Sequence, residues 1–313
     1  MDTCESAVLA EKKQSGMPVA LAKAAVSASI FVWFVAAFQL ALGLFAVARW
    51  MVTGNLGHLD HFFQYQGSLF LVGFALAEYL LSIIAWRLFD AGDAMRSAWF
   101  FVMIASGCRV AGLIVANFLS GFAYGGPQSA GRAAANPQVT ALRDLGLTIS
   151  SPVTMALLSI GLLLVVRLYR KVGLLRRLRW PDFVLLGVVG LFLGSQVVEL
   201  TRWLWSSEQP VTMLKGVSWL VDPLVGMLFV EAVLLRRSVV NMGGGLIGRC
   251  WGAYTAAIFL TSMGGMGIWA LNSGFVPWQF CYVTSCVWFL ASIAYALGPA
   301  YQVEAVVRAR AAG

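Results

Sequence analysis

The sequence predicts an all-α protein of the polytopic membrane class, a bundle of eight transmembrane helices with both termini in the cytoplasm. Of the 313 residues, 60% are hydrophobic and only 12% are charged, whereas soluble domains carry roughly 25% charged residues. The hydrophobic residues form long continuous blocks, and the basic residues gather between alternate blocks. Together these observations predict helices that cross a bilayer repeatedly.

Eight apolar blocks carry this prediction, because each is near or above the ~17 residues that a helix needs to cross the hydrocarbon core. In chain order they cover Ala24–Ala48, Phe62–Trp86, Ala98–Ala123, Ser150–Val166, Phe183–Leu204, Leu214–Leu235, Cys250–Leu271 and Val276–Tyr301. We expect the first block to remain as a helix, since its apolar run exceeds the ~15 residues of a cleavable signal segment. The expected organisation is one transmembrane domain over residues 24–305, between cytoplasmic tails at 1–23 and 306–313.

Basic residues predict the orientation of the bundle. The loop between the fourth and fifth blocks, residues 167–182, is strongly basic with the single acid Asp182, and loops rich in Lys and Arg face the cytoplasm. With eight crossings the remaining basic clusters fall on the same side: Lys12, Lys13, Lys23, Arg87, Arg96, Arg236, Arg237, Arg249, Arg308 and Arg310. The net charge of +8 therefore reflects topology, and no basic segment resembles a nucleic-acid-binding surface.

The longest loop predicted on the outer side covers residues 121–145. Its Gly, Ala, Ser and Pro content leaves no apolar stripe, so we expect irregular structure there. Long loops in compact folds often serve as lids or docking sites. The alternative is a tolerated insertion without a function.

Glu78 and Arg109 are opposite charges placed deep within the second and third blocks. Such charges are costly to bury in a membrane and point to function. A short loop joins the two blocks, so their helices should be antiparallel neighbours, and at 1.5 Å per residue the two side chains lie at matching depths. We expect an ion pair, which is either a binding or proton-relay site or a structural link that fixes the helix register.

Further polar candidates lie in the fifth and sixth blocks. Gln196, Glu199 and Arg202 recur at helical spacing along one side of their helix, either as site residues or as a local pair at the interface. Asp222 precedes Pro223, where a kink would expose backbone carbonyls beside a carboxylate, an arrangement that suits a proton or cation site.

Two other features of the apolar blocks have a structural and a functional interpretation. Glu231 should extend toward the cytoplasm near Arg236 as a structural residue. The cluster Gly264, Gly265 and Gly267 predicts either a close helix crossing or an unwound segment that lines a cavity.

The tryptophans fall into two groups. Eight lie near predicted helix ends, where indoles favour the headgroup layer: Trp50, Trp86, Trp99, Trp180, Trp203, Trp205, Trp219 and Trp278. Four others pack in the bundle or line a cavity for an aromatic or lipidic ligand such as a quinone: Trp33, Trp251, Trp269 and Trp288.

The sequence predicts no metal site and no cofactor. His58 and His61 lie with Asp60 in one short segment typical of a solvated turn, and neither falls within an apolar block, which argues against haem held by two histidines in the membrane. The five cysteines include no C-x-x-C pair. Nucleophile-elbow, zinc-protease and P-loop motifs are absent, so nothing indicates an enzyme.

These observations favour a transporter-like or ligand-binding membrane protein in a bacterial inner membrane. Its predicted site lies near the midplane among the second, third, fifth and sixth helices, where Arg109 holds an anion or pairs with Glu78, while Glu78 and Asp222 bind a proton or cation. The expected partners are the lipid bilayer and a small molecule or ion. A sensory or accessory subunit that binds protein partners in a membrane complex is the main alternative, and a lipid- or quinone-processing enzyme is a weaker one.

Overall fold

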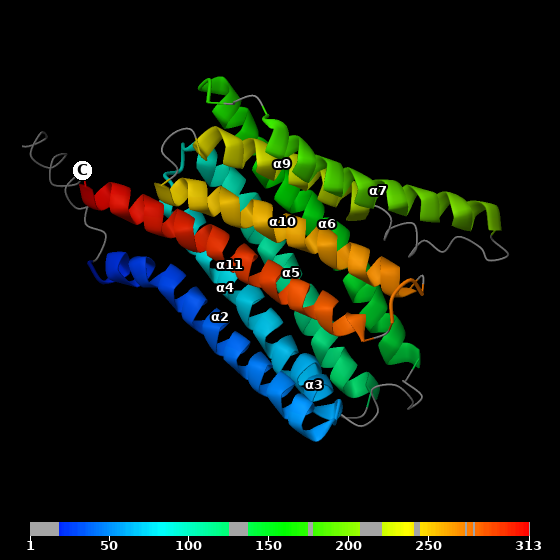
Figure 1. The fold of residues 1–313 in the computed structure, drawn as a ribbon. Coiled ribbons are helices and arrows are strands. Elements are labelled where there is room, and N and C mark those ends of the chain that lie inside the picture. Colours follow the sequence, from blue (N-terminus) through cyan, green and yellow to red (C-terminus); the bar gives the residue numbers. More distant parts are fainter. Residues whose placement is uncertain are drawn as a thin grey trace, which may run out of the picture.

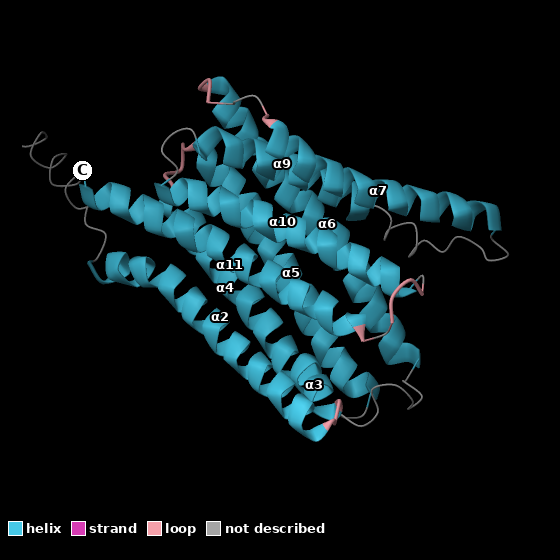
Figure 2. Cartoon of the chain, in the orientation of Figure 1, coloured by secondary structure: helices cyan, strands magenta, loops and turns pink. Residues whose placement is uncertain are grey.

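The computed structural model describes residues 19–124, 137–174, 178–206, 221–240, 245–272, 274–277 and 279–312. Within the helices some side chains lie outside this description, among them those of Gln196, Glu199, Arg202 and Asp222. The described residues are helical apart from short turns, as Figure 2 shows. The helices are α2 (Val19–Thr53), α3 (Gly57–His61), the π-helix η1 (Phe62–Gln66), α4 (Gly67–Leu88), α5 (Ala94–Tyr124), α6 (Pro137–Lys171), α7 (Trp180–Ser206), α9 (Val221–Val240), α10 (Gly245–Asn272) and α11 (Phe280–Ala312).

Six helices in the described part of the chain are long and apolar enough to cross a membrane, so the fold is that of an integral membrane protein. Their apolar spans are Ala28–Thr53, Gly67–Leu88, Ala94–Ala116, Thr148–Lys171, Gly245–Leu271 and Phe280–Arg310. The fifth predicted block corresponds to α7, which has a shorter apolar segment at Trp180–Leu191, and the sixth corresponds to α9.

The helix ends that carry basic residues meet at one end of the bundle. The beginning of α2, the α4–α5 connection, the end of α9, the start of α10 and the end of α11 lie toward the same end in Figure 1. Contacts between side chains tie these ends together. Arg310 at the end of α11 donates to the Leu88 carbonyl and lies 3.8 Å from Asp90. Arg237 near the end of α9 lies 3.4 Å from Asp182 in the first turn of α7.

The two long predicted loops are shorter than expected, because helix continues past the apolar blocks. α5 extends to Tyr124 and α6 begins at Pro137, so part of the 121–145 segment is helical and residues 125–136 lie outside the description. At the basic end, α6 continues to Lys171, which makes the first part of the basic loop a helical extension.

The main core joins α4, α5, α6, α9, α10 and α11, with Val189 from α7. Its largest fully buried side chains include Trp99, Trp251, Tyr254 and Phe229. Trp99 is only 1% exposed and packs with Trp251 and Tyr254. Its predicted placement in the headgroup layer is therefore wrong, and the reason is that this helix face is covered by α10 rather than by lipid.

The glycine cluster of α10 marks a close crossing with α11. α10 is helical through the cluster. A Cβ on Gly264 would lie 2.8 Å from the Trp288 ring, and one on Gly267 would collide with the Thr284 methyl group. The prediction of a close crossing is confirmed, and the alternative of an unwound segment is wrong.

The described part of α9 starts at Val221, two residues before Pro223, so the kink expected at this proline stays a prediction. Residues 207–220 lie outside the described part of the chain.

Candidate ligand-binding site

The site begins with the ion pair between α4 and α5. Arg109 Nη2 lies 3.1 Å from Glu78 Oε2, and the side chains are 16% and 3% exposed. The sequence prediction of a pair across this hairpin is confirmed. Although the two atoms are close, neither Oε2 nor Nη2 makes an aligned hydrogen bond in the described part of the chain, and Arg109 Nε has no hydrogen-bond acceptor there either. Charge and proximity therefore hold the pair.

Ser106 supplies the hydrogen bond that the carboxylate does have. It lies one helical turn before Arg109 on the same face of α5. Its Oγ is 3.0 Å from Glu78 Oε1 and 2.9 Å from the Val102 carbonyl. Because a hydroxyl has one proton, it donates to only one of these oxygens at a time.

Arg109 has an aromatic neighbour on α11. Its guanidinium carbon lies 4.5 Å from the centroid of the Tyr295 ring, within the range of a cation–π contact. The Tyr295 hydroxyl is 3.5 Å from Thr261 Oγ1 on α10. Tyr295 also packs edge-on against Tyr254, so the aromatic core fixes the surface on which the guanidinium rests.

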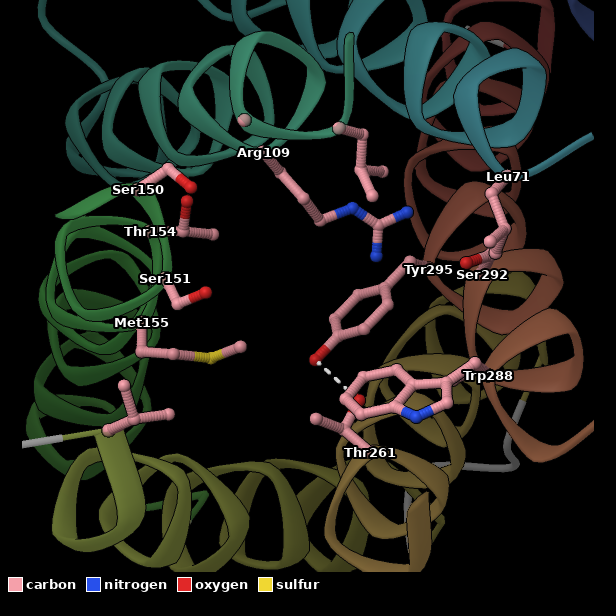
Figure 3. Close-up of a pocket in the computed structure, with 14 residues that line it drawn as sticks. Leu71, Arg109, Ser150, Ser151, Thr154, Met155, Thr261, Trp288, Ser292 and Tyr295 are labelled. Atoms are coloured by element: carbon pink, nitrogen blue, oxygen red, sulfur yellow. Dashed lines mark hydrogen bonds between the residues drawn. The ribbon is translucent and has the colours of Figure 1, made fainter. Parts of the chain in front are cut away.

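A cavity of about 280 Å³ opens beside this guanidinium. Figure 3 shows Arg109 and Tyr295 reaching into it from α5 and α11. Its walls come from six helices, and the lining residues are Leu71, Arg109, Gly112, Leu113, Ser150, Ser151, Thr154, Met155, Val221, Thr261, Trp288, Ala291, Ser292 and Tyr295.

The cavity has two chemically different walls. Hydroxyl groups of Ser150, Ser151 and Thr154 line the α6 side, and the rings of Tyr295 and Trp288 face them across the opening (Figure 3). The Thr154 hydroxyl is buried and has no hydrogen-bond partner among the described residues. A cavity with apolar walls and a few polar groups is the usual form of a small-molecule site.

The cavity lies in the half of the bundle that is remote from the basic end. On α6 its residues are at positions 150–155, whereas the basic end of this helix is at Arg167 to Lys171. On α11 it extends from Trp288 to Tyr295, nearer to the start of the helix at Phe280 than to its basic end. Arg109 therefore stands at the inner boundary of a cavity that extends toward the other end.

The remaining predicted site residues are not brought together here by any described contact. The side chains of Gln196, Glu199 and Asp222 lie outside the description. The predicted set of helices, which includes α7 and α9, stays a prediction, because side chains of both lie outside the description; the described lining comes from α4, α5, α6, α10 and α11, with Val221 from α9. Two runs of consecutive helices, α4 to α6 and α9 to α11, supply the described lining of the cavity.

Glu231 differs from its prediction. It does not extend toward the cytoplasm but is 3% exposed and accepts a 2.8 Å hydrogen bond from Ser159 on α6. Its Oε2 has no hydrogen-bond partner in the described part of the chain. The cause is the tight packing of α9 on α6, which covers this face of the helix before the side chain can reach the headgroup layer.

Several site residues were not predicted. Ser106, Thr154, Thr261 and Tyr295 are types that occur throughout membrane helices, so none stands out alone. The one usable signal was the spacing of Ser106 from Arg109, because side chains three apart share a helix face. Among the four tryptophans considered for a cavity, Trp288 lines it, whereas Trp251 is buried in the core.

Among the described residues, no group of three or more His, Cys, Asp and Glu side chains could hold a metal ion. The side chains of Asp60 and His61 lie outside that search. No protein-family model matches this chain, and no curated protein or solved structure matches it significantly.

Proposed function

We propose that this protein binds a small molecule in the cavity between α5, α6, α10 and α11, as a transporter-like or ligand-binding membrane protein. The observation that carries the proposal is the guanidinium of Arg109, which faces a cavity of about 280 Å³ from within a membrane-type bundle. Charged groups at such depth are costly and usually functional. The volume lies just below the usual range of ligand pockets, about 300–1,000 Å³, which limits the ligand to a small molecule.

A purely structural ion pair fits these observations less well. A buried pair repays its desolvation only when its geometry is good and its remaining donors and acceptors are satisfied. Here Nη2 and Oε2 lack aligned hydrogen bonds within the described residues, and Nε lacks an acceptor there. Buried donors without acceptors suit a ligand group that displaces Glu78 from Arg109.

The proposal includes eight crossings, cytoplasmic termini and a bacterial inner membrane. It treats α7 and α9 as crossing helices in addition to the six apolar spans. The gathering of basic helix ends at one end of the bundle supports a cytoplasmic assignment for that end. In this orientation the cavity faces the outer side.

The proposed function is tested by ligand-induced stabilisation of the purified protein in lipid nanodiscs. A panel of small carboxylates, neutral aromatics, amines and sugars is screened for a rise in the unfolding temperature, since a ligand that binds only the folded state stabilises it. We expect hits with the wild type that disappear in Arg109→Gln. Arg49→Gln serves as the control, because Arg49 is exposed on α2 and lines no part of the cavity. Equal hits in wild type and Arg109→Gln would contradict the proposal.

The accessory-subunit alternative is supported by α7. This helix extends beyond the rest of the bundle in Figure 1, and Leu191 and Trp205 on it are 74% and 93% exposed. Purification from the native membrane distinguishes the two functions: an accessory subunit is recovered with a stoichiometric partner that crosslinks to α7, and a self-contained binding protein is recovered alone.

A further inference from the structure

We propose that the ligand of this cavity is a small carboxylate with an apolar or aromatic body, and that Glu78 takes up one proton when the carboxylate docks on Arg109. The inference rests on the proposed function and names its ligand class and its coupling. Anion and proton then enter the site together, so that binding adds no net charge to the interior of the bundle.

The first step is the charge balance of the empty site. Glu78 on α4 faces Arg109 and Ser106 from α5, and the phenols of Tyr254 and Tyr295 from α10 and α11. Arg109 is the only cation among the described residues lining the cavity, and Glu78 neutralises it. The two charges therefore cancel before any ligand arrives.

The second step is the hydrogen-bonding capacity of Arg109. A guanidinium forms two parallel hydrogen bonds with a carboxylate, which is a stronger arrangement than a single contact. Glu78 does not form such a pair, since its one close contact is unaligned and Nε is without an acceptor in the described part of the chain. Nε and Nη2 are themselves buried, so a ligand carboxylate that docks from the cavity would take up both donors by displacing Glu78 from the guanidinium.

The third step concerns the proton. Two carboxylates beside one guanidinium leave an excess negative charge in a poorly solvated interior, and one of them is then protonated. Once Glu78 is protonated, its O–H group has a hydrogen-bond acceptor close by. When the acid is neutral it donates to Ser106 Oγ, and Ser106 donates its own proton to the Val102 carbonyl at 2.9 Å. When the acid is ionised, Ser106 donates to Glu78 instead.

The walls of the cavity define the body of the ligand. Leu71, Leu113 and Met155 present apolar surface, and Trp288 and Tyr295 present rings. The buried Thr154 hydroxyl, unpartnered among the described residues, offers one further hydrogen bond. A monocarboxylate with a compact aromatic or branched body matches this combination, whereas a phosphate or a dicarboxylate would introduce charge that one guanidinium does not balance.

The binding step is balanced without any covalent change in the ligand. One proton leaves the solvent and forms an O–H bond on Glu78, while the ligand carboxylate replaces Glu78 as the partner of Arg109. No oxidant, reductant or leaving group is involved.

The test is a titration of the wild-type protein in nanodiscs with benzoate, with benzamide as the neutral control of matched shape. Calorimetry in two buffers of different ionisation enthalpy counts the protons taken up. We expect about one proton per benzoate where Glu78 is ionised in the free protein, and an affinity that rises as the pH falls, by at most about tenfold for each pH unit. Benzamide should bind without a proton and without this pH dependence.

Two variants separate the roles of the charges. Arg109→Gln should lose benzoate binding at every pH, whereas Glu78→Gln should bind benzoate with no proton uptake and no pH dependence. Glu231→Gln, which removes a buried acid that does not line the cavity, should keep the wild-type proton count.

The outcomes distinguish this inference from the proposed function. Benzoate binding without proton uptake in the wild type overturns the coupling and leaves the ligand site intact. Binding of benzamide with no binding of benzoate or acetate up to about 10 mM overturns the anion assignment, while the proposed function stands. If no compound of any class binds or stabilises the protein, both fail.

Discussion

At the scale of single residues, the two members of the ion pair differ in their access to water. The Glu78 side chain is 3% exposed, whereas that of Arg109 is 16% exposed and faces the cavity. Removing one partner of a buried pair leaves the other uncompensated, and the cost depends on how well the remaining charge is solvated. The two single substitutions should therefore have unequal effects.

We predict that Arg109→Gln lowers the free energy of unfolding by about 3 kcal/mol near neutral pH, and Glu78→Gln by about 1 kcal/mol. The first leaves a carboxylate enclosed by protein, and the second leaves a guanidinium that cavity water can reach. As the pH falls, protonation of Glu78 removes the stranded charge, so Arg109→Gln should regain stability relative to the wild type. Unfolding in detergent between about pH 8 and about pH 5 measures both effects.

The double variant Glu78→Gln, Arg109→Gln is the control for this cycle. It removes both charges and should be more stable than Arg109→Gln alone. Two results would contradict the unequal roles of the two charges. One is an equal loss of unfolding free energy in both single variants, and the other is a loss in Arg109→Gln that does not change with pH.

Replacing Glu231 should cost little stability, unlike replacing Arg109. No salt bridge to Glu231 is present among the described residues, and its one hydrogen bond comes from Ser159. Glu231→Gln keeps an acceptor for Ser159 and removes the need to bury a charge. We predict a change in unfolding free energy of less than about 1 kcal/mol, measured by thermal unfolding. A loss as large as that of Arg109→Gln would indicate that Glu231 balances a cation.

At the scale of helices, small residues set how closely neighbouring helices approach and thereby the width of the cavity. Membrane helices pack through small residues because no hydrophobic force drives them together in lipid. A Cβ on Gly112 of α5 would collide with Ser150 of α6, and both residues line the cavity. One substitution at such a crossing changes packing and cavity shape together.

The α10–α11 crossing tests whether a small residue is needed where two helices approach closely. Gly267→Ala places a methyl group against the Thr284 methyl, so we predict a loss of about 1–3 kcal/mol in unfolding free energy. Adding Thr284→Ser removes the opposing methyl and keeps the hydroxyl that donates to the Cys281 carbonyl. The double variant should recover most of the loss in a thermal unfolding experiment.

Gly252→Ala is the matched control on the same helix, since a Cβ there would meet no atom within 4 Å. It should be neutral or slightly stabilising, because alanine favours helix over glycine by roughly 1 kcal/mol. If Gly252→Ala destabilises as much as Gly267→Ala, helix propensity or insertion rather than the crossing is responsible.

The sequence was informative about elements and about one contact between them. The apolar blocks located the helices, and the short connection between the second and third blocks placed Glu78 beside Arg109. Helix ends were less predictable, since polar turns such as Pro137 onward continue a helix beyond the apolar block. The kink expected at Pro223 stays a prediction, because residues 207–220 lie outside the described part of the chain.

At the scale of the whole molecule, the cavity could not be predicted because it is assembled from helices far apart in the chain. Ser150 on α6, Thr261 on α10 and Tyr295 on α11 meet only after the bundle has closed. Which face each helix turns inward depends on packing against several neighbours. A single sequence gives the depth of these residues but not the rotation of their helices.

The proposed topology, with the basic end of the bundle in the cytoplasm, predicts which of three connections react with a thiol reagent applied from outside the cell. In a cysteine-free background, Gly92→Cys and Val172→Cys lie in exposed turns at the basic end, and Phe275→Cys lies in the α10–α11 connection at the opposite end. A membrane-impermeant thiol reagent applied to intact cells should modify position 275 only. Opening the cells should make positions 92 and 172 reactive. Labelling of position 92 or 172 in intact cells would contradict the cytoplasmic assignment.

The contacts of α2 set the order in which the molecule can be completed during synthesis. α2 packs chiefly on α11, where Ser29 donates to Glu304 and the Trp33 indole donates to the Tyr301 hydroxyl. These partners are separated by 275 and 268 residues. Because α2 is synthesised before the other described helices and α11 after them, the face of α2 that packs on α11 contacts lipid until α11 has been inserted. Closure of the bundle, and with it the wall of the cavity that α11 provides, is the final event of assembly.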